Sequence, residues 1–502
     1  MHWPAPACAV GSEEAPATVP VAPLKIALPA AALPLLLAGA PACAAVGGHH
    51  DPIAPVILGV TGILFFALVG RYLARMLGQP SVLGELLIGI AMGNGLYWAG
   101  VDLALILREG QAVLTMVADA MGGESWRHAA RQDLGAAAAE PVLAVLRGPA
   151  GGAYLQIAQT VDIFSRYGVI FLLFLVGLET SLPELRRSGA DAIRVALAGV
   201  VAPFLLGLVT ARLLLPDISL AADLFVAATL AATSIGITAR VLADLQQSRS
   251  REARVILGAA VIDDVLGLVM LAIVTGIIVT GRVDPLAIGG VVGLSALFFL
   301  GVFVASPLFL RLIVRLVRHL DLAEAKLFVS FIFVMALAWF ANLMGLATIV
   351  GAFAAGLILH EGYFVYWGDR DDEELTIRDL ISPLQIVLAP IFFVLMGVQV
   401  KLETFLDWQV GLLALGLTAA AMIGKLVAGW AARRGFNRTA IGVAMMPRGE
   451  VGLIFASIGK SLGVITDALF SAVVLMVVVT TLVTPMLLKR LLGVRASPAL
   501  HT

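Results

Sequence analysis

The sequence has few of the residues from which soluble binding sites and catalytic sites are usually built. Only 13% of its 502 residues are charged, and Cys8 and Cys43 are its two cysteines. Both cysteines lie near the N-terminus, so they predict neither a disulfide framework nor a metal site in the rest of the chain. The net charge is −1 and no basic block is present, which argues against a nucleic-acid partner.

Long apolar segments, and not charged residues, dominate the sequence. Hydrophobic residues make up 60% of the chain, a share that a soluble globular protein of this size does not need. Apolar segments of about 20 residues recur, and each is long enough to cross the roughly 30 Å hydrocarbon core of a bilayer. We therefore expect an all-α polytopic membrane protein with about 13 spans. The approximate limits are 53–75, 80–99, 164–182, 192–214, 221–243, 255–280, 286–308, 324–343, 346–361, 380–400, 409–431, 439–460 and 466–488.

Residues 1–50 are typical of a targeting region. Lys25 precedes an apolar core that is interrupted by proline and closed by small residues ending at Ala44. That arrangement resembles a secretory signal peptide, which is removed from the mature protein. Glu13 and Glu14 depart from the pattern, and the alternative is an uncleaved extra helix.

The distribution of lysine and arginine predicts the orientation. These residues follow the first, third, fifth, seventh, eleventh and last spans, whereas the opposite short loops hold little more than Arg282, Lys401 and Lys460. Positive loops stay in the cytoplasm. We therefore expect a multi-pass membrane protein with its mature N-terminus outside and a short cytoplasmic tail, 491–502. A signal peptide would also place the mature N-terminus outside.

One predicted external connection is long. Residues 100–163 are rich in alanine, with charged residues spaced through them. We interpret them as a surface insertion with one or two interfacial helices. A further pair of membrane segments would preserve the orientation of everything that follows, and it is the alternative.

Six ionisable residues fall inside the predicted spans. A charge in an apolar medium is costly. An ionisable residue inside a span is therefore a candidate functional residue when a partner for it can be named. The six are Glu85, Asp263, Asp264, Lys425, Arg448 and Glu450.

Asp263 and Asp264 are the most unusual of these, because they are adjacent. They lie about nine residues into a span that begins in the cytoplasm, which is roughly 13 Å deep and near the midplane. Neighbouring residues on a helix do not share a face, so the two carboxylates must meet different surroundings. Lys425, in the middle of its own span, is the expected counter-ion for one of them. A buried group that only fixes helix packing is the alternative, but it leaves the second carboxylate unexplained.

Two spans carry signs of interruption. Residues 231–241 crowd Thr233, Ser234 and Gly236 into mid-span, and residues 445–452 place Pro447 and Gly449 around Arg448. Proline removes a donor, glycine loosens the backbone, and hydroxyls can satisfy the freed groups. A shift of roughly 215 residues brings the two segments into register in spans of opposite direction, as an inverted transporter repeat requires. Ordinary helix packing could explain either segment alone.

Five segments resemble motifs of the monovalent cation:proton antiporter-2 family, over nearly all of residues 53–490. The pair of aspartates with a later lysine is similar to the bacterial sodium/proton exchangers of that family. The glutathione-gated potassium efflux systems of that family typically have glutamine before the aspartate, where this chain has Asp263. The segments are 79–93, 168–182, 233–244, 345–359 and 447–454.

The resemblance implies a core domain of two inverted repeats, 192–280 and 409–488, beside a domain that forms a homodimer. Carried over by position, it makes Asp264 the carboxylate that binds Na⁺ or a proton, and Asp263 the partner of Lys425. Thr233 and Ser234 would lie where the broken helices cross, and Arg448 and Glu450 would stabilise the second of them. The insertion departs from the family pattern but is expected to lie outside the core.

The expected function is secondary active antiport, in which cytoplasmic Na⁺ or Li⁺ leaves as external protons enter, by alternating access and with net charge movement. It would serve pH and sodium homeostasis. A K⁺/H⁺ antiporter on the same scaffold is the alternative. A channel would need a continuous polar lining, and adjacent aspartates on one helix cannot converge on one peptide bond as in a hydrolase. Neither an enzymatic activity nor a cofactor is predicted.

Overall fold

The computed structural model describes residues 51–492 apart from 52, 80, 180–188, 217, 235–237, 239–241, 243–246, 248–249, 281–284, 318, 368–374 and 449. The predicted signal region and nearly all of the predicted tail therefore lie outside the described residues. The described part is helical, and its one ladder contact is an isolated bridge between Arg434 and Phe436. This confirms the expected all-α class.

Helices occupy the predicted spans. The first half of the chain has α2 (Ala54–Met76), α3 (Ser81–Trp98), α7 (Gly151–Glu179), α9 (Gly189–Leu214), α10 (Leu220–Ala231), α12 (Arg251–Thr280) and α13 (Pro285–Leu316). The second half has α14 (Leu322–Leu343), α15 (Thr348–Ile358), α16 (Ile377–Val398), α17 (Trp408–Trp430), α18 (Arg438–Ala444), α19 (Glu450–Ser461) and α20 (Asp467–Leu491). Seven of the described helices are long and apolar enough to cross a membrane. The chain is therefore a polytopic helical membrane protein.

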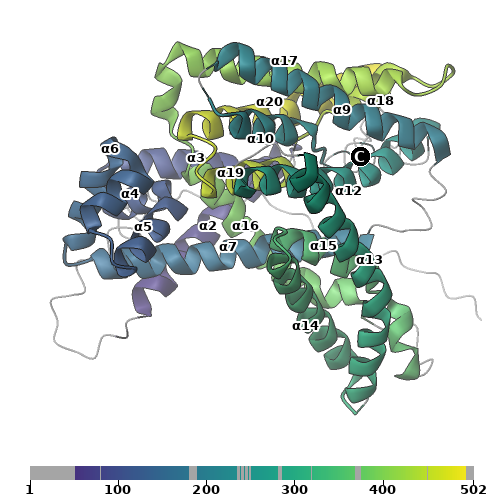
Figure 1. Ribbon diagram of the computed structural model, residues 1–502, viewed down its shortest axis with the longest axis horizontal. Helices are drawn as coiled ribbons and strands as arrows, with labels where there is room; N and C mark the ends of the chain where they lie inside the picture. The colour runs from purple at the N-terminus through teal and green to yellow at the C-terminus, as the bar shows by residue number, and fades with distance from the viewer. Residues whose placement is uncertain are drawn as a thin grey trace, which may run out of the picture. The chain divides into compact units, whose positions relative to one another are not determined.

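The membrane helices pack as two bundles. The repeat bundle comprises α9, α10, α12 and α17 to α20, in which α9 contacts α17, α10 and α12, and α20 contacts α17, α18 and α19. Figure 1 shows α9, α10, α17 and α20 grouped together. The scaffold bundle comprises α2, α3, α7 and α14 to α16, with α7 packed on both α15 and α16. Within the described residues the bundles share few contacts, among them one between α16 and α19.

The residues between α3 and α7 form three further helices, α4 (Asp102–Glu109), α5 (Gln111–Met121) and α6 (Trp126–Arg147). We call residues 100–150 the insertion. Helix α6 is kinked at Gly135, whose φ of 75° suits glycine. None of these three is among the described helices that could cross a membrane. Helix α7 begins at Gly151 rather than at residue 164, so the predicted connection ends earlier than expected.

Glycine lets helices of the scaffold bundle touch through their backbones. A Cβ built at Gly356 of α15 would overlap the carbonyl oxygen of Phe174 on α7, and one at Gly397 of α16 would overlap the carbonyl oxygen of Leu86 on α3. Small residues permit this approach where lipid offers no hydrophobic drive for helix association.

We expect Gly356→Val to destabilise the protein by about 1–3 kcal/mol, because the new side chain forces α15 away from α7. Thermal unfolding in detergent, followed by the loss of the monodisperse elution peak, measures the change. Gly62→Ala is the matched control, since a Cβ at the buried Gly62 of α2 meets nothing within 4 Å. Equal melting temperatures for Gly356→Val and Gly62→Ala would contradict the close contact.

Candidate functional site

Both predicted interruptions are present. Helix α10 ends at Ala231 and residues 232–234 are not helical, while α18 ends at Ala444, residues 446–448 are not helical and α19 begins at Glu450. The corresponding helices of the two halves thus break at corresponding positions, as the inverted repeat requires.

The two breaks bond to each other. The Ser234 backbone N–H donates to the carbonyl oxygen of Pro447 at 3.0 Å. The Thr238 hydroxyl donates to the carbonyl oxygen of Ala444 at 2.8 Å. Backbone groups that are freed where a membrane helix unwinds must find partners inside the protein, and here each segment supplies partners for the other.

Arg448 is fully buried and connects the two breaks by its side chain. Its Nη1 donates to the carbonyl oxygens of Ala231, at 3.2 Å, and of Ala232. These carbonyls end α10, where a helix carries partial negative charge and has orphan acceptors. The carbonyl oxygen of Arg448 accepts from the Thr481 hydroxyl of α20 at 2.7 Å. Arg448 therefore ties the second break to the first and to α20.

A buried ion pair lies in the same bundle. Lys425 Nζ on α17 is 3.1 Å from Asp263 Oδ2 and 3.2 Å from Asp263 Oδ1 on α12. The ammonium also donates to the carbonyl oxygen of Gly199 on α9 at 2.7 Å. Neither side chain is exposed. A Cβ at Gly199 would come within 3.2 Å of Lys425 Nζ, so this glycine leaves the room in which the pair meets.

The sequence matches the family description "Sodium/hydrogen exchanger, transmembrane" over residues 63–493. The chain belongs to the sodium/hydrogen exchanger family. A high-affinity Na(+)/H(+) antiporter, NhaS3, of Synechocystis is 33% identical over 441 residues, which cover 86% of this chain and 89% of the relative. The Na(+)/H(+)-K(+) antiporter GerN of Bacillus cereus is 31% identical and covers 70% of this chain and 89% of its own length.

A solved structure shares the fold of this exchanger-family chain. The sodium proton antiporter MjNhaP1 from Methanocaldococcus jannaschii at pH 8 superposes with a TM-score of 0.58 at 16% identity, over 89% of this chain and 100% of that one. The expected family resemblance and the fold that it implied, with its two broken crossing helices, are therefore confirmed.

The described structure brings together part of the predicted site. Asp263 and Lys425 form a pair, and Thr233 and Ser234 are buried at the first break. The backbone of Asp264 lies in α12 and that of Glu450 begins α19, but their side chains are outside what the structure describes. The roles predicted for all these residues in ion exchange stay predictions.

Glu85 lies apart from this group. Its carboxylate pairs with Arg71 of α2 at 2.7 Å and is nearly unexposed. It joins two neighbouring helices of the scaffold bundle, as expected for a carboxylate that faces a helix neighbour instead of the ion.

Sequence reasoning missed two contributors, Gly199 and Thr481. Gly199 acts through its carbonyl group and its lack of a side chain, which no local pattern reveals. Thr481 stands next to Thr480 in an otherwise apolar stretch of α20. Two adjacent threonines in an apolar span could have indicated a buried hydrogen bond there.

We expect Lys425→Met to destabilise the protein by about 3–5 kcal/mol, because it leaves the Asp263 carboxylate buried without a partner. Asp263→Asn combined with Lys425→Met should recover much of that loss, since no bare charge remains. Thermal unfolding of the single and double variants in detergent checks this. If the double variant were as unstable as the sum of its single variants, the pair would not be coupled.

We expect Thr481→Val to cost about 1–3 kcal/mol, because it leaves the buried Arg448 carbonyl oxygen without its donor. Thr484→Val is a matched control of the same shape, since the Thr484 hydroxyl bonds to the Thr480 carbonyl within α20. Urea unfolding in mixed micelles compares them. A cost for Thr484→Val equal to that for Thr481→Val would remove the case for a link to the second break.

Proposed function

We propose that this chain is a secondary active antiporter that exchanges cytoplasmic Na⁺, or Li⁺, for external protons by alternating access. The observation that carries the proposal is the crossing of two broken helices in the bundle that holds the buried Asp263–Lys425 pair. Broken helices at corresponding positions of two repeats are where transporters bind their ions. NhaS3 of Synechocystis and a relative from Enterococcus hirae are Na(+)/H(+) antiporters, which supports the same class.

Exchange follows from the cost of a bare carboxylate in an apolar setting. Asp264 can hold a proton or a cation, but ionised and unpartnered it is expensive, so one must replace the other. Thr233 and Ser234, with backbone oxygens of the unwound segment, would complete the coordination of the cation. Asp264 is thus the proposed Na⁺ ligand, and Arg448 and Glu450 hold the second crossing segment in place.

The pair beside it supplies a second proton site. If Asp263 and Lys425 separate during the cycle, the group can take up and release a proton of its own. Two protons would then enter for each sodium ion that leaves, and the cycle moves one net charge, worth about 2.3 kcal/mol per 100 mV of membrane potential. We therefore propose an electrogenic cycle that serves pH and sodium homeostasis.

The K⁺/H⁺ antiporter remains a second candidate, and one observation favours it. The relative GerN is a Na(+)/H(+)-K(+) antiporter, and at 31% identity it is nearly as similar to this chain as NhaS3 at 33%. The fold and the buried pair serve either cation.

The proposal includes an arrangement in the cell. Residues 1–50 act as a signal peptide and residues 51–490 as the exchanger, in which the insertion, 100–150, forms an external connection before α7. Residues 491–502 form a cytoplasmic tail. The protein lies in the bacterial inner membrane as a homodimer with its mature N-terminus outside. The alternation of basic loops supports this orientation.

Everted vesicles from an antiporter-deficient strain test the function. They are energised by respiration, and a dye reports internal acidity as Na⁺, Li⁺ or K⁺ is added. We expect the dye signal to recover with Na⁺ and Li⁺ in the wild type and to stay quenched in Asp264→Asn, because the amide cannot exchange a proton for a cation.

The matched control is Asp162→Asn, which neutralises an aspartate paired with Arg166 on its own helix. It should recover as the wild type does. Recovery with K⁺ alone would select the second candidate. Full recovery in Asp264→Asn would mean that the buried charges only fix helix packing, and the mechanism above would be wrong.

A further inference from the structure

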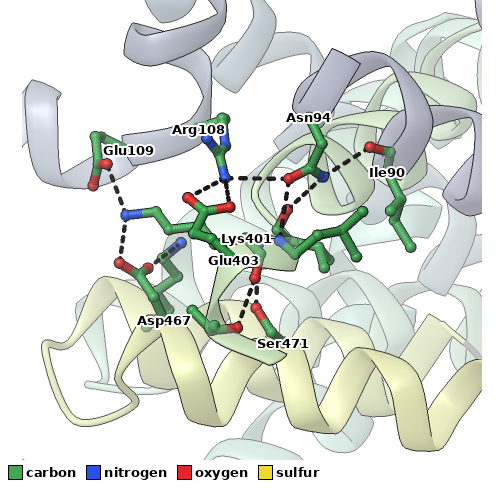
Figure 2. A network of polar contacts seen from close by, with 12 residues as sticks. Ile90, Asn94, Arg108, Glu109, Lys401, Glu403, Asp467 and Ser471 are labelled. Carbon is green, nitrogen blue, oxygen red and sulfur yellow. Dashed lines mark hydrogen bonds and ion pairs between the residues drawn. The ribbon is translucent and has the colours of Figure 1, made fainter. Parts of the chain in front are cut away.

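A second polar cluster lies away from the site, and exchange chemistry makes no use of it. Figure 2 shows it where the insertion meets the linker between the bundles. The linker is residues 399–407, which run from α16 of the scaffold bundle to α17 of the repeat bundle and include the short helix η3 (Leu402–Leu406). Such a linker is the place where a movement between the bundles must be absorbed.

The linker is fixed to the scaffold side by buried groups. Asn94 of α3 donates to the Val400 carbonyl oxygen at 2.9 Å and accepts from the Leu402 N–H at 3.1 Å. Arg108 of the insertion donates through Nη2 to both carboxylate oxygens of Glu403, at 2.7 Å each. Asn94 and Arg108 are each 1% exposed.

Lys401 joins this fixed linker to the insertion and to the repeat bundle. Its Nζ is 2.7 Å from Glu109 Oε1 at the end of α4 and 2.5 Å from Asp467 Oδ2 at the start of α20. Its backbone N–H donates to the Ser471 hydroxyl at 3.2 Å. Asp467 also pairs with Lys460 of α19 at 2.9 Å, but that contact lies within the repeat bundle. Among the described ion pairs, the two made by Lys401 thus connect the insertion to α20.

The Lys401 ammonium is charged in this setting. Burial lowers the pKa of Lys401, but the carboxylates of Glu109 and Asp467 outweigh burial, so its pKa ends above its ordinary value. Whichever bundle the linker follows in a movement, one of the two ion pairs must separate. Separation from Glu109 would leave that carboxylate, whose side chain is 8% exposed, without its described ion-pair partner. Separation from Asp467 would leave Asp467 with Lys460 and Lys401 with Glu109.

A cavity of about 500 Å³ lies beside this contact. The insertion lines one side of it with Glu109, Thr115 and Asp133, and Lys460 and Leu462 line it from the end of α19. The insertion therefore lines part of a space between the bundles, and its helices pack on α3, α7 and α16 of the scaffold bundle.

We propose that Glu109, Lys401 and Asp467 form a latch by which the insertion stabilises this arrangement of the two bundles and so governs the conformational step of exchange. The latch rests on the proposed function only in that this step is the alternating access of an antiporter. Lys401 and Glu109 are positioning residues, because they act through the placement of the bundles and not on the ion.

Distances across the cavity test the latch without requiring transport. The full-length protein, with Cys8 and Cys43 replaced by serine, carries spin labels at Thr115→Cys and Leu462→Cys, two exposed positions on its lining. Pulsed electron paramagnetic resonance in lipid nanodiscs then gives the populations of the label separations. We expect one main separation with the latch intact and a shift of about fivefold or more toward a second one in Glu109→Gln.

Two further variants sharpen the comparison. Lys401→Gln should produce a similar shift, and adding it to Glu109→Gln should change the populations little more, because both remove the same link. Asp162→Asn removes a carboxylate that also lines the cavity. Its partner Arg166 lies on α7 with it and its partner Gln111 lies in the insertion, so neither contact reaches the repeat bundle. It should leave the separations unchanged.

Transport supplies the second readout. Glu109→Gln should change the rate of dye recovery but leave the preference among Na⁺, Li⁺ and K⁺ unchanged. Substitution of an ion ligand, in contrast, should change that preference. Identical separations in wild type and Glu109→Gln would overturn the latch, as would an equal shift in Asp162→Asn. If no cation restored the dye signal while Glu109→Gln still shifted the separations, the proposed function would fail and the latch would stand.

Discussion

The structure depends on one constraint, which is that a polar group in the membrane interior must find its partner within the protein. Breaking a helix there creates orphan donors and acceptors, and two breaks that face each other can satisfy them together. Ser234 and Pro447 do this through the backbone, and Arg448 does it by reaching the end of α10. Each break thus supplies partners that the other needs, and the inverted repeat places the two face to face.

The same constraint divides the two bundles. The repeat bundle holds polar groups in its interior, where the Lys425 ammonium meets both Asp263 and a carbonyl oxygen that Gly199 leaves open. Close helix contacts at glycines occur in both bundles, at Gly356 in the scaffold bundle and at Gly424 in the repeat bundle. What distinguishes the repeat bundle is that its two helix breaks lie in the same bundle as a fully unexposed ion pair. A buried ion pair can part only if each member finds another partner, and the proposed alternating access would require such an exchange of partners.

Sequence alone predicted most of the fold, because apolar length and helix-breaking residues are local signals. The start of α7 was misplaced because its first turns, after Gly151, are too rich in small and polar residues to look like a membrane span. The few charges inside the spans made Lys425 the natural partner of an aspartate. The Lys401 contacts could not be predicted in the same way, since nothing near Glu109 or Asp467 in the sequence says which loops meet in space.

The two charge clusters differ in their access to water, and this would separate the proposed ion binding from its proposed control. Asp263 and Lys425 are unexposed, whereas the Asp467 side chain is 33% exposed and the Lys401 side chain 14%. Salt weakens interactions between exposed charges more than interactions between buried charges. We therefore expect salt to weaken the Lys401–Asp467 contact of the proposed latch more than the Asp263–Lys425 pair. In the proposed mechanism, an insertion that departs from the family pattern would then adjust the movement of the exchanger without a change at the ion site.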